Sequence, residues 1–264
     1  MQKGFERHDQ AGLVYYTVPQ LDATKVVRHC FTTRLGGVST GETASLNLGF
    51  HKKDTRENVL RNYEILCNAI HTRPDRLVLS NQVHGDCVRL VTQADAGKGV
   101  TRESDIVGVD AFVTNCRGVA PVIFTADCVP VLLLDPVKKV IGLAHSGWRS
   151  TAKQIAKKTV QAMMRLGSDA GDILAAIGPS IGPCHFETDD DVASCFSQQY
   201  VRKQGKKYYV DLWSIVASQL CDTGVRDQNI TLAQLCTVCH ADEFFSNRAH
   251  RGKIGLMGAV MELL

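Results

Sequence analysis

The sequence lacks several features that would assign it to a specialised class of protein. No run of 18 apolar residues is present, which excludes a membrane-spanning helix, so we expect no membrane association. The formal net charge is only +3, and basic residues form scattered pairs such as Lys52-Lys53 and Lys206-Lys207. We interpret these pairs as solvated turns and helix faces, so no nucleic-acid partner is expected. Repeats and low-complexity linkers are also missing, which favours one domain over residues 1–264.

Two common catalytic motifs are absent as well. The glycine-rich segment Gly178-Pro-Ser-Ile-Gly182-Pro183 has no following Lys-Ser or Lys-Thr, so it is not a phosphate-binding P-loop. No Gly-x-Ser-x-Gly sequence occurs, which excludes the nucleophile elbow of α/β-hydrolases. The first ten residues contain no apolar segment typical of a signal peptide, and we therefore expect a cytoplasmic protein.

Cysteine, by contrast, is abundant. Without a secretory signal, the 10 cysteines are better interpreted as free thiols than as a disulfide framework. Cys236-Thr-Val-Cys239 has the CxxC spacing of redox-active and metal-binding thiols, but no second CxxC completes a zinc ribbon. The sequence therefore favours structural or incidental thiols at these two positions.

Short apolar segments alternate with segments of helical periodicity. Helices are predicted from a start at Asp54–Glu57 to Ile70, over 151–166, over 189–199, and over 212–221 with Asp211 as the cap. Because strands outnumber helices and several connections are hairpins, we predict an α+β fold of mixed β-sheets with helices packed on the outside. The predicted strands cover residues 26–33, 77–80, 87–91, 110–114, 120–125, 130–134, 139–144, 173–177 and 253–262.

Two histidines and one cysteine suggest a catalytic metal. His84, Cys128 and His145 are three ligands of the kind that hold zinc and leave a fourth position for water or substrate. The midpoint of positions 128 and 145 falls between Pro136 and Val137, inside an Asp-Pro turn that joins two apolar strands. In an antiparallel hairpin these two residues would lie directly opposite each other, close enough to share one ion. A one-residue slip of register would turn one of them to the other face.

Other interpretations of the same residues remain open. A buried cysteine and a hydrogen-bonded histidine at a strand end are common without any metal. Alternatively, Cys128 could act as a nucleophile with His145 as its base, which would make the protein a hydrolase or amidase. A third class is a non-catalytic metal or interaction module. Metal analysis distinguishes the zinc enzyme from the cysteine hydrolase, because a nucleophilic cysteine needs a free thiol.

The segment from His145 to Ser150 predicts an anion site. It leaves a strand and enters a helix expected to begin near Thr151, and a helix N-terminus offers unpaired N–H groups to an anion. Gly147 lets the backbone approach closely, and Arg149 adds a planar fork that suits phosphate oxygens. The alternative is an ordinary surface arginine beside a helix start.

Short motifs run in order along almost the whole chain: Ser45–Gly49, Asn81–Gly85, Asp110–Thr114, Thr125–Cys128, His145–Arg149, Ile177–Cys184, Cys236-Thr237 and Phe244–Ser246. As a set, these segments resemble the YfiH-like laccase-domain family, also called the polyphenol oxidoreductase or purine nucleoside phosphorylase YfiH family. The resemblance implies a single α+β domain of the CNF1/YfiH-like type, with His84, Cys128 and His145 as zinc ligands.

The resemblance also implies an activity. Members are credited with zinc-dependent phosphorolysis of adenosine, inosine and methylthioadenosine to the free base and ribose 1-phosphate, with adenosine deamination as a second activity. The expected partners are therefore a purine nucleoside and phosphate, and we expect a monomer or homodimer. Removal of a wrong amino acid from a peptidoglycan precursor, by Cys–His chemistry, is an alternative proposed for relatives.

Copper chemistry is the remaining alternative. A Cys/His site also accepts Cu2+, so a copper-dependent polyphenol oxidase stays open. However, the trinuclear copper clusters of laccases use His-x-His pairs, and none of the nine histidines forms one. We therefore expect zinc as the main cofactor.

Further roles follow from the resemblance and from position. We expect Cys128, Asp127 and Arg149 to be catalytic, with Asp127 transferring a proton or orienting a ligand, and Asn47, Arg149 and Arg248 to bind substrate or phosphate. Two positions depart from the family pattern. Ala249 replaces the second of two paired arginines after Phe244-Phe245-Ser246, and His185 follows Cys184 where a second cysteine or another residue is common. These departures concern the substrate range, not the metal.

Overall fold

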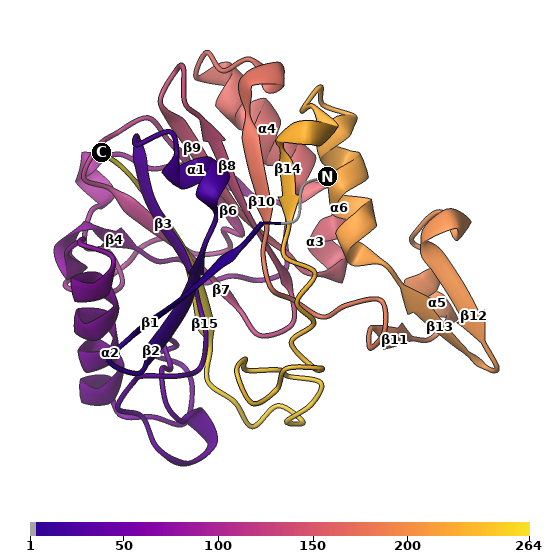
Figure 1. Ribbon diagram of the computed structural model, residues 1–264, viewed down its shortest axis with the longest axis horizontal. Helices are drawn as coiled ribbons and strands as arrows, with labels where there is room; N and C mark the ends of the chain where they lie inside the picture. The colour runs from indigo at the N-terminus through magenta and orange to yellow at the C-terminus, as the bar shows by residue number, and fades with distance from the viewer. Residues whose placement is uncertain (1–3) are drawn as a thin grey trace.

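Two six-stranded β-sheets form the centre of the structure, a computed structural model that describes residues 4–264 (Figure 1). Both sheets contain parallel and antiparallel neighbours, as the sequence predicted. The first has the order β1 (Glu6–Gln10), β2 (Leu13–Thr17), β3 (Val27–Thr32), β15 (Met257–Leu263), β7 (Ala120–Thr125) and β4 (Leu77–Val78). The second has the order β14 (Ile230–Leu232), β10 (Leu174–Ile177), β8 (Val129–Asp135), β9 (Val140–Ser146), β6 (Ala111–Thr114) and β5 (Val88–Leu90).

Helices lie outside these sheets, and a small third sheet projects from one end of the molecule (Figure 1). The third sheet has the order β11 (Glu187–Thr188), β13 (Lys207–Val210) and β12 (Val201–Gln204). None of the helices among residues 4–264 is long and apolar enough to cross a membrane. The α-helices are α1 (Pro19–Asp22), α2 (Arg56–Ala69), α3 (Trp148–Ala152), α4 (Ile155–Arg165), α5 (Asp190–Ala193) and α6 (Leu212–Cys221). The short 3₁₀ turns are Gly41–Thr43, Pro74–Arg76, Gln93–Asp95, Ala170–Asp172, Gln198–Tyr200 and Asp227–Asn229.

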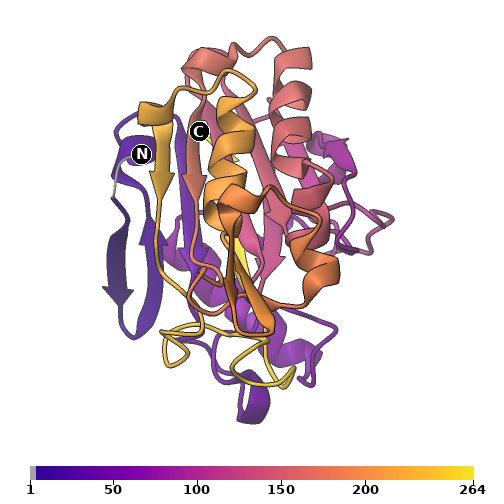
Figure 2. The ribbon, with the colours of Figure 1, turned by 90° about the vertical axis from the view of Figure 1, so that its right-hand side faces the viewer.

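The alternation of side chains along the strands sets the order of the layers. In β8, Leu132 and Leu134 point into the core between the two sheets, whereas Val131 and Leu133 point into a core covered by α4 and α6. Figure 2 shows α4 and α6 side by side over this second sheet. Helix α2 covers the outer face of the first sheet through a third apolar cluster. The result is one α+β domain with the layers helix, sheet, sheet, helix.

The helix predicted over residues 151–166 is wrong in two ways. It begins earlier, at Trp148, and it is divided into α3 and α4 by Gln154, whose φ of 61° is left-handed. A residue in this conformation cannot continue a right-handed helix, so the chain changes direction between the two helices.

Other boundaries differ to a smaller extent. The predicted helix over 189–199 is reduced to α5 and a 3₁₀ turn, because Ala193 is its only buried side chain and a longer helix would bury little more. The closing strand begins at Met257 instead of residue 253. Helix α6 is confirmed, with the Asp211 carboxylate accepting a hydrogen bond from the amide of Ser214 at 3.1 Å. Strands β1, β2, β11, β12, β13 and β14 were not predicted.

His29 in β3 is a buried titratable group whose protonation is linked to folding. Its Nε2 accepts a hydrogen bond from the amide of Val18 at 2.8 Å, and its Nδ1 lies 3.5 Å from Asp22. Burial lowers the pKa of His29 to about 4; the carboxylate of Asp22 opposes this shift, and His8 adds to it weakly. Between pH ~6.5 and ~4 the unfolded chain therefore binds a proton that the folded chain does not.

We expect the free energy of unfolding to decrease as the pH falls through this window, by about 2–3 kcal/mol from this residue. The His29→Gln variant keeps a carbonyl oxygen for the amide of Val18 but does not titrate, so its decrease should be smaller by that amount. Urea titrations of both proteins at pH 7 and pH 4.5 measure the difference. Equal losses in the two proteins would show that His29 is not responsible.

Candidate metal and substrate site

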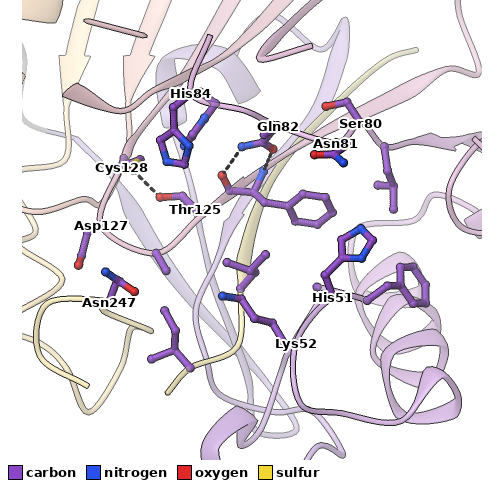
Figure 3. Close-up of a pocket in the computed structure, with 18 of the residues that line it drawn as sticks. His51, Lys52, Ser80, Asn81, Gln82, His84, Thr125, Asp127, Cys128 and Asn247 are labelled. Atoms are coloured by element: carbon purple, nitrogen blue, oxygen red, sulfur yellow. Dashed lines mark hydrogen bonds between the residues drawn. The ribbon is translucent and has the colours of Figure 1, made fainter. Parts of the chain in front are cut away.

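A cavity of about 890 Å³ lies beside the three predicted metal ligands. This volume is within the range of pockets that bind small molecules. Figure 3 shows His84, Cys128 and Asp127 on one side of the cavity, with His51 and Lys52 on the opposite side. The lining also contains an apolar part, made by Phe50, Leu79, Ile106, Val107, Phe124, Ile254 and Leu256.

His84, Cys128 and His145 are brought together as predicted. Their donor atoms all lie within 4.8 Å of one another. The three residues come from the loop after β4, from the position before β8 and from the end of β9. The rings of His84 and His145 meet edge to face, with centroids 4.8 Å apart. One soft thiol and two imidazoles at this separation can hold a single metal ion.

The register of the hairpin differs from the prediction. Strands β8 and β9 pair Pro130 with His145, so Gly147 and not His145 would face Cys128. The predicted direct opposition is therefore wrong by two residues. Side chains alternate along a strand with a period of two, so an offset of two leaves both ligands on the same face. The two ligands converge for this reason despite the shifted turn.

Gly147 supplies the space in which the ligands meet. A Cβ atom at this position would lie 2.9 Å from the Sγ of Cys128 and 2.9 Å from the Cδ2 of His84. Its φ of −66° is ordinary for any residue, so the requirement for glycine here is steric. A side chain at this position would displace both ligands.

Asp110 orients both histidines, a role that the sequence did not reveal. Its carboxylate accepts hydrogen bonds from the backbone amides of Val83 (3.1 Å), His84 (2.9 Å) and Gly85 (2.8 Å). It also lies 2.8 Å from the Nδ1 of His145. Asp110 is completely buried, so these bonds are shielded from water. The loop that carries His84 and the ring of His145 are thus held by one side chain.

Charge interactions between Cys128 and His145 favour the thiolate form of Cys128 and the protonated form of His145, which must release its proton to bind a metal. Burial raises the pKa of Cys128, but the positive charge of His145 and hydrogen bonds from His145 and His84 outweigh burial and lower it to about 6. Burial lowers the pKa of His145, whereas the Cys128 thiolate and Asp110 raise it to about 9. For Asp110, burial raises the pKa, and the hydrogen bonds from His145 and the amide of Gly85 more than reverse this. A thiolate is the form of cysteine that binds metals.

Arg149 lines the cavity, but its setting differs from the prediction. It lies in the first turn of α3, not before a helix that begins at Thr151. The turn closes because the hydroxyl and amide of Thr151 both donate to the carbonyl of Gly147, at 2.9 and 2.7 Å. A helix of five residues has a weak dipole, so anion binding here would depend on the guanidinium itself. That group stacks over the ring of Trp148, 4.2 Å from its centroid.

Asp127 and Arg248 form part of the cavity wall. The Asp127 carboxylate accepts hydrogen bonds from the hydroxyl of Thr237 at 2.6 Å and the amide of Arg248 at 2.7 Å. Both of its oxygens are therefore engaged, which favours positioning over the predicted proton transfer. The Arg248 guanidinium donates to the carbonyls of His185 (3.0 Å) and Glu187 (2.9 Å), so it holds the neighbouring loop.

Asn47 does not reach the cavity, contrary to the predicted substrate contact. It is fully buried, and its amide donates to Asp54 and accepts from the amides of Gly49 and Leu256. We therefore assign Asn47 a structural role.

Several polar residues of the cavity were not predicted. They are the adjacent pair His51 and Lys52, together with Asn81 and Asn247, and these come from three segments that no spacing in the sequence connects. Gln82 is held by both of its amide atoms, which bond to the backbone of Phe124 at 2.9 and 2.6 Å. Burial lowers the pKa of Lys52.

The chain is similar to known proteins over most of its length. The family described as "Multi-copper polyphenol oxidoreductase laccase" matches residues 28–264. A Bacillus subtilis protein named purine nucleoside phosphorylase YlmD is 36% identical over 236 residues, which cover 86% of this chain and 85% of the relative. A purine nucleoside phosphorylase of Deinococcus radiodurans is 36% identical over 256 residues, covering 96% and 94% of the two chains.

Solved structures show the same fold. YlmD from Geobacillus stearothermophilus superposes with a TM-score of 0.91 at 33% identity and covers 99% of each chain. The YfiH protein of Bacillus licheniformis superposes with a TM-score of 0.92 at 30% identity, covering 98% of this chain and 99% of its own. The predicted fold class is therefore confirmed.

Proposed function

We propose that this chain, which belongs to the multi-copper polyphenol oxidoreductase laccase family, is a zinc-dependent purine nucleoside phosphorylase. The relatives named above as purine nucleoside phosphorylases support this proposal. The proposed substrates are adenosine, inosine and methylthioadenosine, which phosphate would cleave to the base and ribose 1-phosphate. Adenosine deamination is proposed as a second activity. The observation that carries the proposal is the convergence of His84, Cys128 and His145 beside a cavity of about 890 Å³.

The donor set suits zinc. Asp110 engages the Nδ1 of His145, which leaves Nε2 as the metal-binding atom, and this arrangement is typical of metal-bound histidines. Two imidazoles and one thiolate are a ligand set of catalytic zinc, and they also accept copper. When bound, the ion would supply Lewis acidity at the edge of the cavity.

The remaining residues would bind and orient the substrates. The guanidinium of Arg149 can donate two parallel hydrogen bonds to phosphate oxygens, and its stacking on Trp148 limits its freedom before binding. The apolar part of the cavity, which includes Phe50 and Phe124, offers flat surfaces for a purine ring. The hydrogen bond between the amide of Arg248 and Asp127 would stabilise the cavity wall beside Cys128.

Product analysis with and without phosphate tests this proposal. With adenosine and phosphate we expect adenine and ribose 1-phosphate, and without phosphate some inosine. Chromatography separates these products. Robust oxidation of phenols in copper-free buffer, with nucleosides untouched, would mean that the proposed substrate class is wrong.

A cysteine amidase is the second candidate, and one observation favours it. Asp110, His145 and Cys128 are linked as an acid, a histidine and a thiol, the arrangement that activates a nucleophilic cysteine. Such an enzyme, for example one that edits a peptidoglycan precursor, would keep its turnover after chelation of metals. It would lose turnover when Cys128 is alkylated. The zinc enzyme would lose turnover on chelation.

Arg149 provides a prediction specific to phosphate. Replacement by alanine removes a charged hydrogen-bond partner, and replacement by lysine keeps the charge but loses the fork. Losing such a bond costs roughly 1.5–3 kcal/mol, so we expect phosphate-dependent efficiency to fall about 10- to 150-fold in Arg149→Ala and less in Arg149→Lys. Deamination, which needs no phosphate, should suffer less.

Both activities are measured on each variant after zinc content is shown to be unchanged. Arg165→Ala, at the exposed end of α4, is the matched control and should retain both activities. Equal losses of the two activities in Arg149→Ala would mean that Arg149 supports the site generally and does not bind phosphate.

A further inference from the structure

A second group of metal-binding side chains lies outside the site described above. Cys184 and His185 follow strand β10, and Cys236 and Cys239 follow β14. The Nδ1 of His185 lies 3.2 Å from the Sγ of Cys184, 3.6 Å from that of Cys236 and 3.4 Å from that of Cys239. The sulfurs of Cys184 and Cys239 are 3.7 Å apart, and all four donor atoms lie within 4.8 Å of one another.

These separations agree with tetrahedral coordination. Zinc binds sulfur at about 2.3 Å and imidazole nitrogen at about 2.0–2.1 Å, so tetrahedral angles place two sulfurs about 3.8 Å apart and a sulfur and a nitrogen about 3.6 Å apart. The sulfur–sulfur distance of 3.7 Å and the sulfur–nitrogen distances of 3.2 to 3.6 Å are close to these values. All four cysteine and histidine donors therefore surround one point.

The backbone brings the four residues together independently of their side chains. Ser180 donates from its amide to the carbonyl of Leu235 at 3.1 Å, and Thr237 donates back to the carbonyl of Ser180 at 3.1 Å. The amide of Gly182 also donates to the Sγ of Cys236 at 3.2 Å, a contact that favours a thiolate. The two segments are thus paired like short parallel strands at this point.

We propose that Cys184, His185, Cys236 and Cys239 form a closed structural zinc site. Three thiolates and one imidazole complete a tetrahedral shell and leave no position for a substrate, which is the pattern of structural zinc. The CxxC pair alone predicted only structural or incidental thiols. The two partners that complete the set are about 50 residues earlier in the chain and meet it only in the folded protein.

The site would support one wall of the cavity. The carbonyl of His185 accepts a hydrogen bond from the guanidinium of Arg248, and Thr237, inside the CxxC turn, donates to Asp127. Zinc would therefore tie together the two segments that position Arg248 and Asp127. This inference does not depend on the proposed nucleoside chemistry.

Metal analysis of a double variant tests the site. Cys184 and Cys239 are both exposed, so Cys184→Ser with Cys239→Ser should fold. We expect zinc to fall from about two equivalents per chain to about one, with a melting temperature several degrees lower. A matched control, Cys195→Ser with Cys221→Ser, also changes two exposed cysteines and should keep both zinc ions. In the cobalt-substituted protein, the double variant should lose most of the thiolate-to-cobalt absorption.

Several results would overturn the proposal. They are no zinc in the unmodified protein, a zinc content that is the same in the double variant as in the unmodified protein, a disulfide joining any two of Cys184, Cys236 and Cys239, or copper bound at this site in place of zinc. The Cys128→Ala variant, measured in parallel, should keep the cobalt spectrum of this site. Loss of nucleoside activity without loss of the second zinc would therefore concern only the proposed function.

Discussion

Replacing Cys128 with alanine is expected to remove about one metal equivalent per chain and to lower nucleoside turnover roughly a thousandfold or more, because a metal contributes several kcal/mol to the transition state. Cys128 supplies the only thiolate among the three converging ligands, and two histidines alone bind zinc weakly. Elemental analysis of gently purified protein and steady-state assays with inosine and phosphate measure the two effects.

The fold of this variant should remain intact. Cys128 is only half-buried, and its side chain is small, so we expect the circular dichroism spectrum to be unchanged. Cys195→Ala, which removes an exposed thiol, should keep both metal and turnover. A Cys128→Ala protein with its full metal content would refute the assignment of this ligand set.

Asp110→Asn is expected to have the second large effect. The Asp110 carboxylate accepts four hydrogen bonds, from the amides of residues 83–85 and from His145. An asparagine amide would direct an NH2 group at two of these donors and leave them unsatisfied in a buried site. At about 1–3 kcal/mol for each buried unsatisfied group, the free energy of unfolding should fall by about 2–6 kcal/mol.

Metal affinity should fall as well. Groups that orient metal-bound histidines typically contribute 10- to 100-fold to affinity, so we expect the zinc dissociation constant of this site to rise by about that factor. Competition with a chromophoric chelator measures it, and urea unfolding measures stability. Asp222→Asn, at the exposed end of α6, is the matched control. If affinity stays unchanged while stability falls, Asp110 supports the fold but does not orient the ligands.

Much of the secondary structure could be predicted because it follows from local patterns. The strands between residues 110 and 146 are continuous apolar segments separated by turns, and they appear where predicted. The capped helix after Asp211 also matches. The break at Gln154 was missed because nothing in its local sequence requires a left-handed conformation. Strands β12 and β13 were missed because they are short and polar on their exposed sides.

The site was predicted in part. The three predicted metal ligands meet as expected, although the predicted register between two of them was wrong by two residues. The orienting role of Asp110 was not predicted, since a single acidic residue before a strand carries no signal of its contacts. Asn47 was expected at the substrate, yet it does not line the cavity, and its Oδ1 instead accepts hydrogen bonds from the amides of Gly49 and Leu256, which do.

The sequence by itself determined the chemistry that is available here. Thiols and imidazoles bind soft metals wherever they occur, and the alternation of apolar residues specifies sheets covered by helices. Only the tertiary structure decided which donors share a centre. His84 lies close to Cys128 because the loop that carries His84 is hydrogen-bonded to Asp110. Cys184 lies close to Cys239 because their two segments, about 50 residues apart in the chain, pair with each other. Such contacts depend on strand order and register, which local periodicity does not encode.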